Sequence, residues 1–198
     1  MSLVAENTEA DTRGRILVVA ERLFREIGYQ KTTVADIAKI LRMSPANVYR
    51  FFDSKKAIHE GVARRLMGEV EEAAHAIAEG PANASDKLYM LLATVHRMNS
   101  ERYVGDAKLH EMVRIAMDED WDVCTAHIER IGEIVAGIIA QGMDSGEFTR
   151  ADVETTARCV FTGMLRFFHP QMIAECANKP GPTLDQMIDF LIGAISRK

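Results

Sequence analysis

Apolar residues recur at helical spacing along almost the whole chain, and segments that alternate apolar with polar residues are nearly absent. The first clear stripe predicts a helix with one apolar face, formed by Ile16, Leu17, Ala20, Leu23, Phe24 and Ile27. Gly28 follows this stripe and can adopt the left-handed conformation that ends many helices. The pattern therefore predicts an all-α protein.

Two short helices joined by a tight turn are predicted next. Thr33 is the expected N-cap of the first, with Asp36 placed to reach back to the Thr33 backbone and complete a capping box. Arg42 lies in the turn. Ser44 caps the second helix, and Pro45 occupies its first position, where the missing N–H costs nothing. Two short helices in this order are typical of a helix-turn-helix.

A fourth helix is expected to begin after an Asp53 or Ser54 cap and to run to about Ala78. The chain then divides into a small head, residues 1–60, and a larger helical body, residues 61–198. Because the boundary falls inside the fourth helix, an unbroken helix there would couple the two parts mechanically.

The stripes after residue 80 predict five or six further helices. Ser85 or Asp86 is expected to start the first of them. Gly142 and Gly146 are expected to end a long helix, and Pro170 to end the one that follows it. The segments with the clearest stripes are residues 85–104, 107–117, 120–143, 151–168 and 183–196.

Formal charge is distributed unevenly, although the whole chain carries only −5. Residues 12–56 hold 10 Lys and Arg against 4 Asp and Glu, a net charge of +6, whereas residues 61–198 hold 14 against 21, a net charge of −7. An acidic body repels a polyanion, so only the basic head would approach one. Nucleic acid is therefore a candidate partner in spite of the acidic balance of the chain.

Composition narrows the class of protein further. The chain has 198 residues, 47% hydrophobic and 27% charged, as expected of a globular protein with a core. It has no run of 18 apolar residues, so we expect no membrane span, and its polar N-terminus lacks the apolar stretch of a secretion signal. Three widely spaced cysteines suit buried thiols in a reducing compartment. A cytoplasmic protein is the expectation.

The second short helix carries the residues that could read DNA bases. A helix-turn-helix places the N-terminal turn of its second helix in the major groove. Here that turn holds Ser44, Pro45 and Ala46, which are small enough to let the backbone come close to base edges. Asn47 is the residue of this turn that can make a paired hydrogen bond to adenine.

Other residues of the head are placed to meet phosphate. Thr33 lies at a helix N-terminus, which favours an anion, and Tyr49 can donate its hydroxyl. Arg50 could contact backbone or base. Lys55 and Lys56 fall in the first turn of a helix, where a cation is disfavoured by roughly 0.3–1 kcal/mol, and a bound phosphate would remove that conflict. The alternative is that two exposed lysines tolerate this position.

The head resembles the N-terminal domain of the TetR family of bacterial transcription regulators over about residues 12–58. The matching residues include Arg15-Ile-Leu, Leu23-Phe24, Gly28-Tyr29, Thr32-Thr33-Val34, Ile37-Ala38, Val48-Tyr49 and Lys55. The resemblance implies an all-helical homodimer with a three-helix DNA-binding head and a larger body that binds a small molecule.

The resemblance also implies roles for single residues. It puts Thr33, Tyr49 and Lys55 on the family's phosphate contacts and Arg15 where the family often contacts DNA backbone or minor groove. The groove-facing positions are Pro45, Ala46, Asn47, Arg50 and Phe51. The chain departs from the common pattern at Arg42, where many members have glycine, and at Phe51, where histidine is common. A left-handed Arg42 would cost about 1–2 kcal/mol.

The body is rich in methionine and aromatic residues, which suit a pocket for apolar ligands because methionine adapts to irregular shapes. Ordinary core packing is the alternative for each of them. The candidate effector-binding residues are Met90, Thr94, Met98, His110, Met117, Trp121, Phe161, Met164 and Phe168.

Two later stripes predict a dimer interface in which each chain contributes two helices to a four-helix bundle. Small residues in these stripes would let the helices approach closely. The alternative is that both stripes face the core of their own chain. The candidate interface residues are Ala157, Val160, Gly163, Phe167, Met187, Phe190, Leu191 and Ala194.

No pattern predicts catalysis or a cofactor. The segment His110-Glu111-Met-Val-Arg114 lacks the second histidine of a zinc protease motif. A metal site made by His96, His110 and His127 is a minor alternative, since lone histidines are more often surface or core residues. We therefore expect a non-enzyme without cofactor or structural metal.

The sequence thus predicts a cytoplasmic, homodimeric transcription regulator that senses a ligand, and a repressor rather than an activator. Its partners would be a palindromic double-stranded DNA operator and an unidentified small apolar or amphipathic effector, with no membrane involved. Two alternatives stay open: a DNA-binding regulator without a small-molecule ligand, and a helical enzyme.

Overall fold

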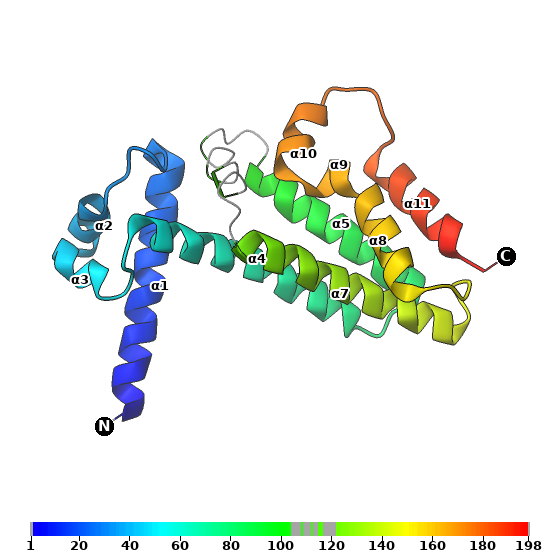
Figure 1. Ribbon diagram of the computed structural model, residues 1–198, viewed down its shortest axis with the longest axis horizontal. Helices are drawn as coiled ribbons and strands as arrows, with labels where there is room; N and C mark the ends of the chain where they lie inside the picture. The colour runs from blue at the N-terminus through cyan, green and yellow to red at the C-terminus, as the bar shows by residue number, and fades with distance from the viewer. Residues whose placement is uncertain (1, 104–107, 109–111, 113–114, 117–121, 198) are drawn as a thin grey trace. The chain divides into compact units, whose positions relative to one another are not determined.

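The computed structural model is built from α-helices (Figure 1). It describes residues 2–103, 108, 112, 115–116 and 122–197. Across these residues no strand forms, and the sole β-type pairing is an isolated bridge between Phe148 and Ser196. The predicted all-α class is therefore confirmed. No helix of the described residues is both long enough and apolar enough to cross a membrane.

The chain forms two compact units. The first holds residues 1–66 with the described residues between 106 and 123, and the second holds residues 67–105 and 124–198. The units part after Leu66, inside helix α4 (Lys55–Ala78), which is unbroken over its whole length.

The first unit packs α1 (Ser2–Ile27), α2 (Val34–Leu41), α3 (Pro45–Tyr49) and the start of α4 around a small core. Helix α1 ends where expected, because Gly28 has φ +96° and donates its N–H to the Phe24 carbonyl. Each helix contributes at least one fully buried side chain, and together these are Ile16, Ala20, Phe24, Ile37, Val48, Ile58 and Val62.

The second unit contains the C-terminal half of α4 and six further described helices. Helix α5 packs against α9, α10 and α11, and α8 packs against α11 (Figure 1). Residues from most of these helices form one continuous core, with Leu88, Leu91, Ile138, Val160, Met164 and Ile188 at its centre. The helices are α5 (Ala84–Tyr103), α7 (Asp122–Ser145), α8 (Val153–Gly163), α9 (Leu165–Phe168), α10 (Pro170–Cys176) and α11 (Leu184–Ile195).

Helix α5 begins at Ala84, just before the expected start at Ser85 or Asp86. Asn83 is the cap, since its side-chain oxygen accepts the Asp86 N–H at 2.8 Å. The Glu147 carboxylate accepts the N–H groups of Ala84 and Ser85, each at 3.1 Å. The start of α5 is therefore fixed partly by a residue about 60 positions away, which local sequence could not reveal.

Helix α7 continues past Gly142, which was expected to help end it. Gly142 lies inside the helix, and a Cβ there would overlap the Phe148 ring and approach the Ala84 side chain. Gly146, with φ +82°, ends the helix instead. Gly142 is thus a point of close packing, whereas Gly146 has the expected role.

The single helix predicted over residues 151–168 is broken at Met164. Asp152 caps α8 by accepting the Thr155 N–H, and Met164, 0% exposed, separates α8 from α9. Pro170 begins α10 rather than only ending α9, in the first helical position that proline favours. The last helix begins as predicted, with Thr183 and Gln186 forming a capping box. Most of the segment 107–117 lies outside the described residues.

Candidate nucleic-acid interface and ligand cavity

The start of α2 is a complete capping box, as predicted. The Thr33 N–H and hydroxyl both donate to the Asp36 carboxylate, at 2.9 and 2.6 Å, and the Asp36 N–H donates to the Thr33 hydroxyl oxygen. The hydrogen bond from the Thr33 hydroxyl, followed by that from its N–H, lowers the pKa of Asp36. Because both Thr33 donors are occupied, a phosphate at this end of α2 would meet the next N–H groups of the helix.

The turn between α2 and α3 is left-handed at Arg42, which has φ 55° and ψ 42°. The Arg42 N–H donates to the Lys39 carbonyl, and the Met43 N–H donates to the Ala38 carbonyl at 3.0 Å. These bonds satisfy the last carbonyls of α2 in the way a glycine C-cap does. The turn therefore keeps its geometry although arginine replaces the more usual glycine.

Helix α3 begins at the predicted cap. The Asn47 N–H donates to the Ser44 hydroxyl oxygen at 3.2 Å, and Pro45 follows in the first turn. Val48 is fully buried and anchors the helix to the core. The opposite face is open to solvent and carries the predicted DNA-facing residues Ser44, Pro45, Ala46, Tyr49 and Arg50.

Two predicted base-reading residues are less open. Asn47 is half-buried, and its amide nitrogen lies 3.9 Å from the Met43 sulfur, which leaves its carbonyl oxygen available. Phe51 is also half-buried, whereas Phe52 is the aromatic residue that enters the core. Asn47 thus keeps at least an acceptor for a base edge.

Arg13 has a structural role that the sequence did not reveal. Its guanidinium donates to the Phe51 carbonyl at 2.7 Å and lies 4.2 Å from the centre of the Phe52 ring. These contacts join α1 to the segment after α3. A pair 38 residues apart has no local sequence signal. Arg15, the predicted DNA contact near the start of this region, is exposed.

Lys55 lies in the first turn of α4, as predicted. Its ammonium donates to the Gln30 carbonyl at 3.2 Å and lies 4.3 Å from the centre of the Tyr29 ring. Partial burial lowers the pKa of Lys55. These contacts within the chain offset part of the unfavourable helix dipole without DNA. The ammonium has three donors, so donors remain for a phosphate.

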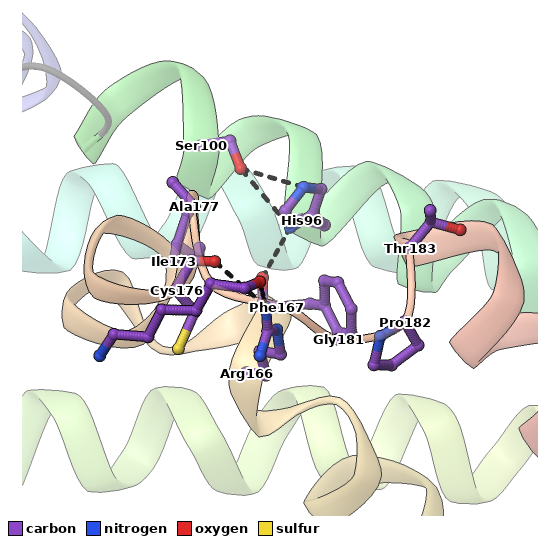
Figure 2. Close-up of a pocket in the computed structure, with 11 residues that line it drawn as sticks. His96, Ser100, Arg166, Phe167, Ile173, Cys176, Ala177, Gly181, Pro182 and Thr183 are labelled. Atoms are coloured by element: carbon purple, nitrogen blue, oxygen red, sulfur yellow. Dashed lines mark hydrogen bonds between the residues drawn. The ribbon is translucent and has the colours of Figure 1, made fainter.

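The second unit contains a cavity of about 410 Å³. That volume is within the range of small-molecule sites. Helices α5 and α9 contribute His96, Ser100, Arg166 and Phe167. Helix α10 and the segment that leads to α11 contribute Ile173, Cys176, Ala177, Lys179, Gly181, Pro182 and Thr183 (Figure 2).

His96 and Ser100 form a small hydrogen-bonded group on the cavity wall (Figure 2). The His96 Nδ1 lies 2.8 Å from the Phe167 carbonyl, and the Ser100 hydroxyl lies 3.2 Å from His96 Nε2. A carbonyl can only accept, so Nδ1 carries a proton. In a neutral ring, Nε2 then accepts from Ser100. The group holds α5 to α9 and presents polar atoms to the cavity.

Arg166 is another polar residue of the cavity lining. Its guanidinium donates to the carbonyls of Cys176 and Lys179, at 3.1 and 2.9 Å. It also lies so close to Gly181 that a Cβ there would meet the guanidinium at 2.8 Å. The segment between α10 and α11 is therefore held by one cationic side chain, and Gly181 is needed for the close approach.

The six predicted effector-binding residues that the structure describes do not line this cavity. Met164 and Phe168 are buried in the core, Met90 is exposed, and Thr94, Met98 and Phe161 are half-buried, but none of the six lines this cavity. His110, Met117 and Trp121 lie outside the described residues. The sequence signal that could have indicated the cavity is the glycine- and proline-rich segment Lys179-Pro180-Gly181-Pro182.

The predicted interface residues divide into two groups. Ala157, Val160 and Phe167 are buried within their own chain, and Gly163 packs against Leu191 of the same chain. The side of α11 away from this core is more open, because Phe190 is 70% exposed and Ala194 is also exposed. Met187 is half-buried. The first group serves the fold, and Phe190 is left as an apolar side chain in solvent.

The described residues contain no group of three or more His, Cys, Asp and Glu side chains that could hold a metal ion. His96 is bonded to Phe167, and His127 pairs with Glu71 at 2.6 Å. Glu71 also binds Arg130 at 2.6 Å, which completes an ion-pair network between α4 and α7. His110 lies outside the described residues.

Family models match both parts of the chain. The model described as "Bacterial regulatory proteins, tetR family" matches residues 16–69, which include the capped helices of the head. The model described as "Tetracyclin repressor-like, C-terminal domain" matches residues 84–184, half of the chain. The chain belongs to the TetR family. It is accordingly a DNA-binding transcription regulator.

Two curated relatives agree with this assignment. The uncharacterised HTH-type transcriptional regulator YhgD of Bacillus subtilis (strain 168) is 22% identical over 147 residues, 74% of this chain and 77% of that protein. IcaR of Staphylococcus aureus, the negative transcriptional regulator of the biofilm operon icaADBC, is 46% identical over 48 residues. The IcaR match covers only 24% of this chain and 26% of IcaR.

Solved structures agree on the fold. A TetR transcription regulator from Haloarcula marismortui has a TM-score of 0.74 at 21% identity, covering 95% of this chain and 100% of that chain. A transcriptional regulator from Saccharomonospora viridis in complex with choline has a TM-score of 0.67 at 21% identity, covering 96% of this chain and 100% of that chain. Similarity at this identity establishes the TetR fold and leaves the effector open.

Proposed function

We propose that this TetR-family regulator is a cytoplasmic, homodimeric repressor that leaves a palindromic operator when a small apolar or amphipathic effector binds its body. The observation that carries the ligand-responsive part is the cavity of about 410 Å³ in the second unit, lined by both polar and apolar side chains. Residues 1–60 serve as the DNA-binding domain and residues 61–198 as the effector-binding and dimerisation domain.

In this proposal α3 lies in the major groove. Its solvent-facing residues Pro45, Ala46 and Arg50 approach the bases together with Asn47, whose free carbonyl oxygen can accept from an adenine amino group. Phe51 offers apolar contact to a thymine methyl group.

Phosphate contacts on both sides of α3 set the register of the head on the duplex. They come from the N-terminus of α2 beside Thr33, from the exposed Tyr49 hydroxyl, and from the remaining donors of Lys55. Arg15 and Ser44 are exposed and extend this surface. Such contacts give affinity and carry no base preference.

Release from DNA follows from a population shift. A dimer reads two half-sites about 34–36 Å apart, so a body conformation that changes the spacing of the two heads lowers operator affinity. An effector that binds this second conformation more tightly weakens DNA binding by the coupling free energy, typically about 1–3 kcal/mol. IcaR, matched over 48 residues, is a negative regulator, which supports repression.

The experiment is selection of genomic DNA fragments by the full-length protein, followed by fluorescence anisotropy on the recovered sequence. We expect an inverted repeat protected at two half-sites, and lower affinity in the presence of metabolites related to the neighbouring genes. Recovery of DNA without any repeat would contradict the palindromic operator. A regulator that no metabolite affects, although its cavity is accessible, would favour the alternative of a DNA-binding protein without an effector.

A further inference from the structure

The cavity of the second unit has an unusual balance of charge. Its lining includes the cationic side chains Arg166 and Lys179 and contains no aspartate or glutamate. The body that surrounds it is acidic, with 21 Asp and Glu against 14 Lys and Arg over residues 61–198. A site with two cations and no carboxylate inside an acidic domain is selective against cations and favours an anion.

Two acidic side chains on the flanking helices are hydrogen-bonded to neutral partners. Asp185, in the first turn of α11, accepts the Tyr89 hydroxyl at 2.8 Å, and Glu175, on α10, accepts the Gln171 amide at 2.7 Å. Neither lines the cavity. Both carboxylates keep their charge but lie outside the lining, so the wall of the cavity itself carries no acidic group.

The polar groups of the lining are suited to oxygen atoms of a ligand. The ammonium of Lys179 and the hydroxyls of Ser100 and Thr183 are hydrogen-bond donors, and Arg166 keeps donors beyond the nitrogen that binds Cys176 and Lys179. Phe167, Ile173 and Pro182 supply apolar surface beside them. Donors grouped with an apolar wall fit a molecule with an anionic head and a short apolar tail.

We propose that this cavity binds a small amphipathic carboxylate, with its head near Lys179 and Arg166 and its tail on Phe167 and Ile173. The proposal rests on the effector-binding role assigned above and specifies the class of effector. A volume of about 410 Å³ lies within the range of small-molecule sites, so a short-chain carboxylate is a suitable probe. A quaternary amine such as the choline held by the Saccharomonospora viridis regulator would find two cations here.

Isothermal titration of the full-length protein without DNA tests this selectivity. The probes are octanoate, octanamide and octyltrimethylammonium, which share a tail and differ in the charge of the head. We expect octanoate to bind about ten-fold more tightly than octanamide, since a hydrogen bond to a charged group contributes about 1.4 kcal/mol more than one between neutral groups. Octyltrimethylammonium should bind most weakly. Equal binding of all three probes, tighter binding of the cation, or no binding of octanoate would overturn the proposal.

Two variants locate the site. Lys179→Gln should lower octanoate affinity about ten-fold and leave octanamide affinity unchanged, whereas Arg158→Gln, a matched loss of charge on the exposed face of α8, should change neither. Ala177→Glu adds a carboxylate at an exposed lining position with helical φ, so it should weaken octanoate and strengthen octyltrimethylammonium. If octanoate affinity is unchanged in both cavity variants, the carboxylate site lies elsewhere and the proposal is overturned.

Operator release separates this inference from the proposed function. Octanoate that binds the cavity without releasing operator DNA would uphold the carboxylate site and contradict the effector mechanism. In the opposite outcome, the protein binds operator DNA and releases it in response to another metabolite, while octanoate does not bind. That result would uphold the proposed regulatory function and overturn the carboxylate site.

Discussion

At the scale of single residues, some of the head's hydrogen-bond donors that could bind DNA phosphate already have partners within the protein. Asp36 occupies both donors of Thr33, and the Gln30 carbonyl and the Tyr29 ring hold Lys55. Such contacts within the protein orient side chains before DNA arrives, which reduces the entropy lost on binding. They also compete with phosphate for the same donors. Whether Lys55 contacts phosphate therefore depends on its two remaining donors.

Replacing Lys55 tests this directly. Lys55→Ala should weaken binding to all DNA sequences about equally and lower the slope of log K against log salt concentration by about 1, because one fewer counterion is released. The measurement is fluorescence anisotropy at several salt concentrations. Lys55→Arg is the matched control and should keep the slope. A Lys55→Ala slope equal to that of the unmodified protein would mean that Lys55 serves only Tyr29 and Gln30.

At the scale of helices, the sequence predicts features that depend on neighbouring residues but not those that depend on contacts between distant residues. Thr33, Ser44 and Gly28 were predicted correctly because a cap depends on residues within about four positions. The role of Gly142 was not predicted correctly, because it depends on the Phe148 ring packing against α7. The cavity was missed for the same reason, since Arg166 binds carbonyls 10 and 13 residues away and His96 binds one 71 residues away.

The two glycines of α7 give a matched pair of substitutions. Gly137 has open space around its Cα, so Gly137→Ala should stabilise the protein by about 0.5–1 kcal/mol through helix propensity alone. Gly142→Ala gains the same propensity but forces the new methyl group into the Phe148 ring, so it should destabilise the protein. Denaturant unfolding of both variants measures the difference. Equal stabilisation by both would show that the Phe148 ring moves aside freely.

Glu147 provides a test by pH. Burial alone would raise its pKa, but hydrogen bonds from the N–H groups of Ser85 and Ala84 and from the Ser145 hydroxyl outweigh it, so the pKa of Glu147 is lowered. A lowered pKa in the folded state gives stability that is present above the unfolded value of about 4.3 and lost as pH falls through the folded pKa. Glu147→Gln should therefore lower Tm at pH 7.

The difference in Tm between Glu147→Gln and the unmodified protein should shrink below about pH 4, where the carboxylate becomes protonated. Glu72→Gln, on an exposed position of α4, is the control and should change Tm little at either pH. A Glu147→Gln deficit that stays constant from pH 7 to pH 3 would show that shape rather than charge matters at the start of α5.

At the scale of the whole molecule, formal charge separates a basic head from an acidic body, and the proposed effector cavity lies in the second unit. The carbonyl and hydroxyl contacts of the cavity join α5, α9 and the segment before α11. The same α11 carries the exposed Phe190. A ligand that moves the segment between α10 and α11 would thus act on the helix proposed to face the second chain. A change in dimer geometry would alter the spacing of the two DNA-binding heads.

Phe190→Ser tests the interface on which that mechanism depends. Phe190 is 70% exposed in a single chain, and burying such a side chain contributes about 1.5–3 kcal/mol, counted twice across a two-fold axis. We expect Phe190→Ser to sediment as a monomer at micromolar concentration. The monomer should lose operator affinity by about 100-fold or more, since it can no longer engage two half-sites at once. Ile128→Ser, at an exposed apolar position of α7 that is not among the predicted interface residues, should remain a dimer. If Phe190→Ser instead forms a stable dimer with full operator affinity, the second chain must pack on another face, and α11 could not carry the signal between the cavity and the heads.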